Sequence, residues 1–151
     1  MIIRKARTED VKAIYALIEE FSRKGDMLPR PILEIYKEVR SFFVCTNDSG
    51  EVVGTCSLAI CLEGLGEVRS LAVKEGSTGK GAGSLLVNAS LEEARDLGLA
   101  EVFALTYTPP FFAKLGFLDT EKEKLPHKIW GECVNCAKFP NCDENAVIIK
   151  L

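Results

Sequence analysis

Long hydrophobic runs are missing from this sequence of 151 residues. Its apolar stretches, such as residues 52–62, are interrupted by Gly54 and Ser57, so they fall well below the roughly 20 residues that a membrane-spanning helix needs. Charged residues at positions 4, 5, 7, 9 and 10 interrupt the segment in which a signal peptide would carry its apolar core. We therefore expect a cytoplasmic protein that has no membrane partner.

An excess of basic charge is also missing: 19 Lys and Arg residues face 22 Asp and Glu residues, for a formal net charge of −3. Non-specific nucleic-acid binding depends on a broad positive surface, so this composition argues against a nucleic-acid partner. Internal repeats and linkers rich in Pro, Gly or Ser are absent as well. The apolar share of 47% and the charged share of 27% are those of an ordinary globular protein. We expect one domain over residues 1–151.

Histidine occurs once, whereas cysteine occurs six times. A reducing cytoplasm disfavours disulfides, so we expect the thiols to be core residues or metal ligands. Cys45, Cys56 and Cys61 lie in apolar strand segments and are typical of a core. The spacing C-x2-C-x5-C in the tail is compatible with a zinc site of three cysteines and one histidine, although packed or partly exposed thiols are the alternative. The candidate ligands are Cys133, Cys136, Cys142 and His127.

The hydrophobic periodicity predicts a mixed α/β protein. Three consecutive strands interrupt an otherwise alternating pattern, which favours a mixed sheet with helices on both faces over a doubly wound parallel sheet. Thr8 is a candidate N-cap for the first helix. The predicted strands are 2–6, 41–46, 51–61, 67–73, 101–106 and 147–149, and the predicted helices are 11–21, 32–39, 84–97 and 109–115.

A glycine-rich loop follows the predicted strand 67–73 and leads into a helix. Gly79, Gly81 and Gly83 leave backbone N–H groups uncovered at the helix N-terminus, and Lys80 adds positive charge, so the loop can bind an anion such as a pyrophosphate. A flexible turn is the alternative. The spacing fits neither the P-loop nor the dinucleotide-binding G-x-G-x-x-G pattern.

Two motifs resemble the GNAT superfamily of acetyl-CoA-dependent N-acetyltransferases. Thr78-x-x-Gly81-x-Gly83 is similar to the signature that begins with Gln or Arg, and residues 111–117 (FFAKLGF) are similar to F-Y-x-K-L-G-F. The resemblance implies the GNAT fold, acetyl-CoA as co-substrate, and a pantetheine arm paired with the backbone of the strand before the loop. The residues that it implies for acetyl-CoA binding are Leu71, Ala72, Val73, Thr78, Gly79, Lys80, Gly81, Ala82, Gly83 and Ser84.

The resemblance also implies catalytic positions. Glu67 is at the position of the family's general base, acting directly or through water, and a surface strand carboxylate is the alternative. The sequence has Phe112 where the family often has a tyrosine that acts as general acid, and Thr78 replaces the usual Gln or Arg. Tyr107, water or no residue would then supply the acid, and Tyr107 could instead be a packed aromatic.

The closer resemblance is to short, single-domain N-acetylglutamate synthase-like proteins of bacterial arginine biosynthesis. It rests on residues 25–30, on L-T-Y at 105–107 with F-F after it, and on the irregular cysteine-containing tail 125–144. It implies L-glutamate as the acceptor and direct transfer in a ternary complex. Arg30 and Arg69 are candidates to bind its carboxylates, with Lys128 as a third, and solvated surface charges are the alternative.

Other functions remain open on the sequence. The acceptor could be another small amine or a protein N-terminus, and the substitutions at Thr78 and Phe112 leave room for a non-catalytic acyl-CoA-binding regulator. Larger N-acetylglutamate synthases carry an amino-acid-kinase-like domain that binds arginine, for which 151 residues leave no room. A homodimer and a structural zinc ion are also left open.

Overall fold

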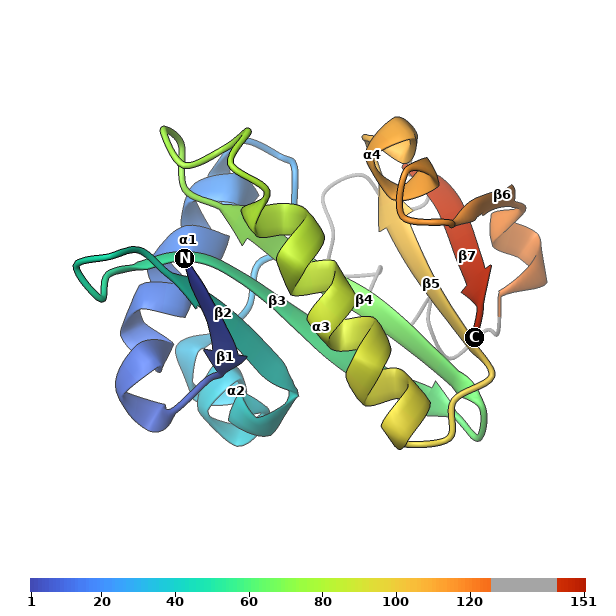
Figure 1. Cartoon of the computed structure of the whole chain (residues 1–151), viewed down its shortest axis with the longest axis horizontal. Coiled ribbons are helices and arrows are strands. Elements are labelled where there is room, and N and C mark those ends of the chain that lie inside the picture. Colours follow the sequence, from blue (N-terminus) through green and yellow to red (C-terminus); the bar gives the residue numbers. More distant parts are fainter. Residues whose placement is uncertain (126–143) are drawn as a thin grey trace.

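A seven-stranded mixed sheet organises the protein (Figure 1), whose computed structural model describes residues 1–125 and 144–151. The strand order is β1-β2-β3-β4-β5-β7-β6, and every neighbouring pair is antiparallel except β4 with β5. Among the described residues, no helix is both long and apolar enough to cross a membrane. The strands are β1 (Ile2–Lys5), β2 (Phe42–Thr46), β3 (Val52–Leu62), β4 (Leu65–Val73), β5 (Glu101–Thr106), β6 (Leu118–Thr120) and β7 (Asn145–Lys150).

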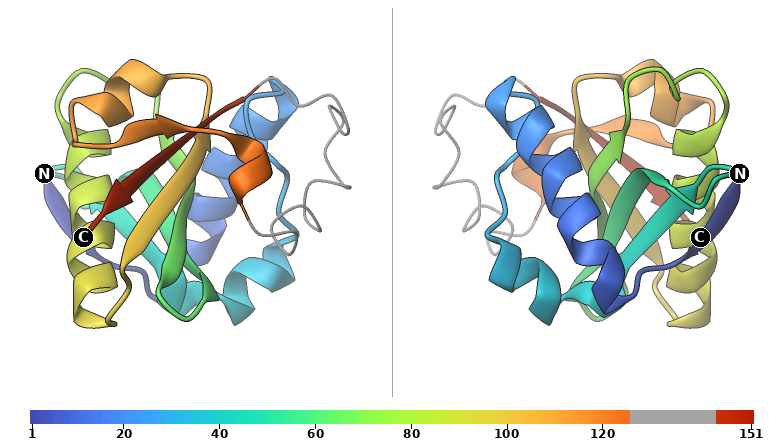
Figure 2. Two further views of the ribbon diagram at one scale, coloured as in Figure 1. Left: turned by 90° about the vertical axis from the view of Figure 1, so that its right-hand side faces the viewer. Right: turned by 90° about the vertical axis from the view of Figure 1, so that its left-hand side faces the viewer.

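Helices cover both faces of this sheet. Helix α3 lies on one face and α1 and α2 lie on the other (Figure 2). Strand β2 shows the consequence, because all five of its residues are buried. Phe42 packs with the residues of α1 and α2, whereas Phe43 packs with Leu86 of α3. The helical segments are α1 (Val11–Arg23), α2 (Ile32–Lys37), α3 (Ala82–Asp96) and α4 (Pro109–Ala113), with short 3-10 turns η1 (Thr8–Asp10), η2 (Val39–Ser41) and η3 (Lys122–Lys124).

The predicted order of elements is confirmed, with one strand in addition. Strand β6 pairs with β7, but its three residues are largely exposed and only Leu118 among them is apolar, so no alternating pattern marks it. The N-cap prediction for Thr8 is wrong. Thr8 lies inside η1, and it is the Asp10 carboxylate that accepts a hydrogen bond from the Arg7 backbone N–H, at 2.7 Å.

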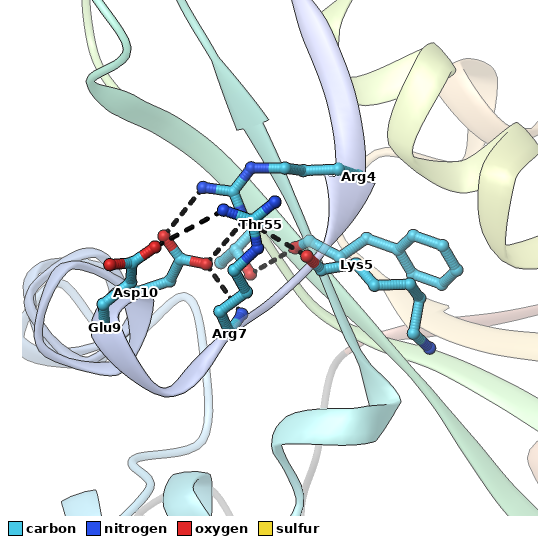
Figure 3. Close-up of polar contacts among 7 residues, drawn as sticks. Arg4, Lys5, Arg7, Glu9, Asp10 and Thr55 are labelled. Atoms are coloured by element: carbon cyan, nitrogen blue, oxygen red, sulfur yellow. Dashed lines mark hydrogen bonds and ion pairs between the residues drawn. The ribbon is translucent and has the colours of Figure 1, made fainter.

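Asp10 also joins the first strand to the first helix (Figure 3). Its two carboxylate oxygens accept hydrogen bonds from Arg4 Nη1 and Nη2 of β1, at 2.7 and 2.9 Å. The Asp10 side chain is only 6% exposed, so the carboxylate is shielded from solvent, whereas the Arg4 side chain is 27% exposed. The hydrogen bond from Arg4 holds the pKa of the Asp10 carboxyl below its ordinary value, and the same contact raises the pKa of Arg4.

We expect Asp10→Ala to lower the free energy of unfolding by about 2–3 kcal/mol at pH 7, because a partly buried guanidinium loses its partner. The contribution is complete above the unfolded-state pKa, near 3.8, and is lost as pH falls through the lower folded-state pKa. Urea unfolding at pH 7 and at decreasing pH measures the gap between the two proteins, which should narrow in acid. Glu9→Ala is the control, since Glu9 meets Arg7 at 3.5 Å on the exposed surface.

The three strand cysteines lie where the sequence predicts them. Cys45 and Cys56 are fully buried, and Cys61 is half-buried against the cluster around Phe103. Burial raises the pKa of the Cys56 thiol to about 12, with Ser90 Oγ only 3.2 Å from its Sγ. The Cys56 thiol therefore stays protonated at neutral pH and is a packing group, not a nucleophile.

Candidate active site

Strands β4 and β5 pair over a short distance only. Their register joins residues 65–67 to residues 101–103, and beyond Glu67 the two strands diverge (Figure 1). At the same point β4 contains an extra residue: Ser57 of β3 pairs with Arg69, whereas Thr55 pairs with Ala72. Ser70 lies within this bulge and has a φ of +56°, in the left-handed region. A bulge bends its strand, which explains why the end of β4 turns away from β5.

The divergence leaves an open strand edge inside the sheet. Among residues 1–125 and 144–151, no strand pairs with residues 70–73 on the β5 side. The side chains here are anchored, because Ala72 is 2% exposed and Leu71 packs against two buried clusters that both include residues of α3. An unpaired edge offers backbone N–H and C=O groups in the spacing that an extended ligand can match.

The glycine loop lies between this edge and α3. Gly76, Gly79 and Gly81 have φ values of +90°, +81° and +86°, and a Cβ placed on any of them would meet no heavy atom within 4 Å. The backbone is thus open on that side. The first hydrogen bond within α3 runs from the Leu85 N–H to the Gly81 oxygen, at 3.0 Å, so the N–H groups of residues 82–84 have no acceptor inside the helix. Such N–H groups bind anions.

Gly83 has a different role from the other loop glycines. A Cβ on Gly83 would lie 3.2 Å from Cζ of Phe111, so the missing side chain lets α3 approach α4 closely. Phe112 is 4% exposed and packs edge-to-face against Phe111 and Phe117, with ring centroids 5.0 and 5.1 Å apart. The F-F-A-K-L-G-F segment therefore forms an aromatic support below the start of α3, and its second ring is part of the core.

Charged side chains lie on the opposite face of β4. Glu67 is 8% exposed, and its Oε1 lies 3.8 Å from Arg69 Nη1, so the two residues share a face as their two-residue spacing predicts. The second nitrogen of the same guanidinium, Arg69 Nη2, lies 3.9 Å from Glu38 Oε1. Arg69 is thus placed between two carboxylates.

Arg30 precedes α2 and is also buried, with its side chain 5% exposed. Its Nη1 donates a hydrogen bond of 2.9 Å to Glu34 Oε1. Glu34 and Glu38 were not among the residues that we predicted from the sequence. Glu34 lies four positions after Arg30, and Glu38 lies four positions after Glu34. This spacing is the signal that could have indicated them, because side chains four positions apart come close together at a helix.

Tyr107 follows the last residue of β5, at the end where β4 and β5 are apart (Figure 1). Its side chain is half-buried. The chain turns directly after it, because the Thr108 N–H donates a hydrogen bond of 2.8 Å to Thr106 Oγ1. The turn leads into α4 and so places Tyr107 beside the open end of the sheet.

Comparison with known proteins decides what this arrangement is. Residues 8–117 match the sequence profile of the acetyltransferase (GNAT) family. The chain belongs to that family. This acetyltransferase is 40% identical over 146 residues to an uncharacterized N-acetyltransferase of Chlorobaculum tepidum, a match that covers 97% of this chain and 94% of that protein. It is 36% identical over 133 residues to an amino-acid acetyltransferase of Mycobacterium tuberculosis, covering 87% and 76%.

Solved structures show the same fold for the acetyltransferase. The Mycobacterium tuberculosis protein Rv2747, solved with CoA and NLQ, superposes with a TM-score of 0.86 at 30% identity and covers 100% of this chain and 99% of that one. N-acetylglutamate synthase of Neisseria gonorrhoeae, solved with coenzyme A and N-acetyl-glutamate, gives a TM-score of 0.88 at 25% identity, with 99% of this chain and 35% of that one covered. The acetyltransferase is therefore an acetyl-CoA-dependent enzyme of the GNAT type, similar to short N-acetylglutamate synthase-like proteins.

The metal candidates of the acetyltransferase lie outside the described residues. These are His127, Cys133, Cys136 and Cys142, and Lys128 lies in the same segment. Within the described parts of the chain, no group of three or more His, Cys, Asp or Glu residues is placed to hold a metal ion.

Proposed function

We propose that the enzyme transfers the acetyl group of acetyl-CoA to the α-amine of L-glutamate, by direct attack in a ternary complex, as a step of arginine biosynthesis. The observation that carries the proposal is the buried guanidinium of Arg30, which α2 connects to the Glu67–Arg69 pair through Glu34 and Glu38. A dicarboxylate acceptor needs guanidinium partners, because their paired N–H donors match a carboxylate. The amino-acid acetyltransferase and N-acetylglutamate synthase relatives support the same acceptor class.

The unpaired edge of β4 and the glycine loop are suited to bind acetyl-CoA, the acetyl donor. The edge at Leu71, Ala72 and Val73 would pair with the pantetheine arm, as an added strand would. The N–H groups at the start of α3 would hold the pyrophosphate, and the open side of the glycine loop leaves space for it. The backbone carries most of this binding, since Thr78 is shorter than the Gln or Arg usual in the family. The residues proposed for the loop contacts are Thr78, Gly79, Lys80, Gly81, Ala82, Gly83 and Ser84.

The reaction needs a group that accepts a proton, and our candidate lies on β4. An N–C bond forms and the C–S bond of the thioester breaks, but the α-ammonium must first lose one proton. The nitrogen loses a second proton as the amide forms, and the leaving thiolate takes up one proton, so one proton is released overall. Glu67 is our candidate acceptor for the first proton, directly or through one water, with the Arg69 guanidinium holding the Glu67 carboxylate in place at 3.8 Å. The leaving thiolate has an ordinary pKa of about 8.5, so its protonation is not demanding. Tyr107 is our candidate donor of that proton, since Phe112 carries no hydroxyl.

We expect Arg30→Ala to raise the KM for glutamate about thirtyfold, because two charge-assisted hydrogen bonds to a carboxylate are lost. The KM for acetyl-CoA should stay unchanged, since the donor binds on the other side of the β4 bulge. Release of free CoA over a panel of amino acids measures both constants. Arg23→Ala is the matched control, because Arg23 is 72% exposed and its ion pair, with Glu19 at 3.9 Å, lies on the surface.

Two results would contradict the proposal. One is CoA release with simple amines that lack a carboxylate but with no amino acid in the panel. The other is an Arg30→Ala variant that acetylates glutamate with the wild-type KM.

A further inference from the structure

A serine of the neighbouring strand β3 contacts the backbone of the β4 bulge. Ser57 Oγ donates a hydrogen bond of 3.3 Å to the backbone oxygen of Arg69, the last β4 residue in register before the bulge. Ser57 is 4% exposed, so this hydrogen bond is largely shielded from bulk water. The bond therefore joins β3 to β4 at the point where their pairing shifts, between Thr55 and Ser57.

The strained residue of the bulge follows Arg69 directly. Ser70 has a φ of +56°, which is unfavourable for a residue that has a side chain. Such a conformation persists only where the surrounding structure holds it. Arg69 and Ser70 share one planar peptide group, so a hydrogen bond to the Arg69 oxygen also restrains the N–H of Ser70. The Ser57 hydroxyl is thus one of the contacts that hold the bulge.

The same peptide group sets the direction of the Ser70 N–H. In a planar trans peptide, the C=O and the N–H point to opposite sides of the chain. The Arg69 oxygen lies toward β3, where it meets Ser57. The Ser70 N–H must then point away from β3, to the side on which β4 and β5 separate and on which no strand of residues 1–125 and 144–151 pairs with it. A backbone donor therefore faces the open strand edge.

This backbone donor lies between the two parts of the proposed site. Ser70 follows the Glu67–Arg69 pair, where we place proton transfer, and it precedes residues 71–73, where we place the pantetheine arm. The thioester joins that arm to the acetyl group, so a donor bound in this way has its thioester beside Ser70. The carbonyl oxygen of the thioester gains negative charge when the amine attacks, and a fixed N–H stabilises such charge.

We infer that Ser57 is a positioning residue for acetyl transfer, whose hydroxyl holds the peptide of residues 69 and 70 so that the Ser70 N–H is directed at the thioester carbonyl. Ser57 acts through this N–H and needs no contact with the substrate. The inference rests on the donor site of the proposed function. It does not depend on glutamate as the acceptor, so it is tested with whichever amine the wild type acetylates.

The test measures both turnover and CoA affinity in Ser57→Ala. Its kcat should fall about tenfold, which is less than the roughly 100- to 1,000-fold typical when such a donor is removed outright. Its dissociation constant for CoA should stay at the wild-type value, because CoA has no thioester carbonyl. Ser57→Thr keeps a hydroxyl that can donate to the Arg69 oxygen, so its kcat should stay within about twofold of the wild type.

Thr55→Val is the matched control. Thr55 is a fully buried residue two positions earlier in β3, but its Oγ1 donates to the Phe43 oxygen of β2, at 2.8 Å, on the side away from the bulge. Valine has nearly the shape of threonine and lacks the hydroxyl, so this variant should lose stability and keep the wild-type kcat. Equal losses of kcat in Thr55→Val and Ser57→Ala would overturn the inference, because any lost strand hydroxyl would then have the same effect.

Other outcomes also bear on the inference. A wild-type kcat in Ser57→Ala would overturn it, as would a CoA affinity that falls as far as kcat, which would indicate a general distortion of the sheet. Turnover only with amines that lack a carboxylate would contradict the proposed acceptor. A tenfold loss of kcat in Ser57→Ala with such an amine, at unchanged CoA affinity, would still support the role of Ser57.

Discussion

Glu67→Gln is expected to lower kcat about a thousandfold at neutral pH, within the range typical for loss of a general base. Glutamine has nearly the size of glutamate, so the packing around this 8% exposed side chain should survive. It cannot accept the proton of the acceptor ammonium. The deficit should shrink as pH rises toward the pKa of the amine, because more acceptor then arrives already deprotonated. Initial rates of CoA release between pH 6 and pH 9 (roughly the range in which acceptor amines begin to deprotonate) measure this trend.

The control for this variant is Glu63→Gln. Glu63 is an exposed residue of the turn between β3 and β4, so its loss should leave the rate unchanged. A wild-type kcat in Glu67→Gln would show that the proton leaves by another route. A deficit that does not change with pH would likewise argue against a role as base.

Gly81→Val should raise the dissociation constant for CoA about a hundredfold, because two effects combine at this residue. The φ of +86° is unfavourable for a residue with a side chain and still more so for a β-branched one. A side chain on Gly81 would also extend into the open space in front of the α3 N–H groups, where a Cβ meets no protein atom within 4 Å. Calorimetric titration with CoA measures the loss of donor binding without any contribution from the acceptor.

Gly76→Val is the matched control for Gly81→Val. Gly76 has a φ of +90° and equally open surroundings in the same loop, so the backbone strain is similar. It lies six positions before α3 begins at Ala82, away from the first-turn N–H groups. Gly76→Val should therefore lose stability without a comparable loss of CoA affinity. Equal affinity losses in both variants would attribute the effect to strain and contradict a direct role of Gly81 at the pyrophosphate.

Local sequence signals were sufficient for most of the fold. Strand β5 coincides with its predicted range of 101–106, because it combines β-branched and aromatic residues and is bounded by Gly98 and the prolines of α4. The glycine loop was also predictable, since alternating glycines directly before an amphipathic helix are typical of a turn with exposed backbone N–H groups. Helix α1 likewise follows its apolar spacing, with Ile14 and Ile18 both buried.

The features that escaped prediction depend on the three-dimensional surroundings of single residues. The β4 bulge contains Ser70, and a serine gives no sequence signal of the φ of +56° that it adopts here. By sequence, Gly83 resembles Gly79 and Gly81 as an anion-binding glycine of the loop. Its small size is instead required by the Phe111 ring, 28 positions later in the sequence. Glu34 is an ordinary helix residue by sequence, and only the burial of Arg30 distinguishes it from the surface pair of Glu19 with Arg23.

The short seam between β4 and β5 has a thermodynamic consequence. The sheet consists of a four-stranded part, β1 to β4, and a three-stranded part, β5 to β7, joined by three residue pairs at one end. A donor that occupied the open end would join the two parts along the rest of their length, in a place where residues 1–125 and 144–151 supply no strand. Its binding free energy would then add to the cooperativity of the whole sheet, since a ligand that binds only the folded state stabilises it by mass action. In this sense acetyl-CoA, bound as proposed, would act both as a substrate and as a structural element of the sheet.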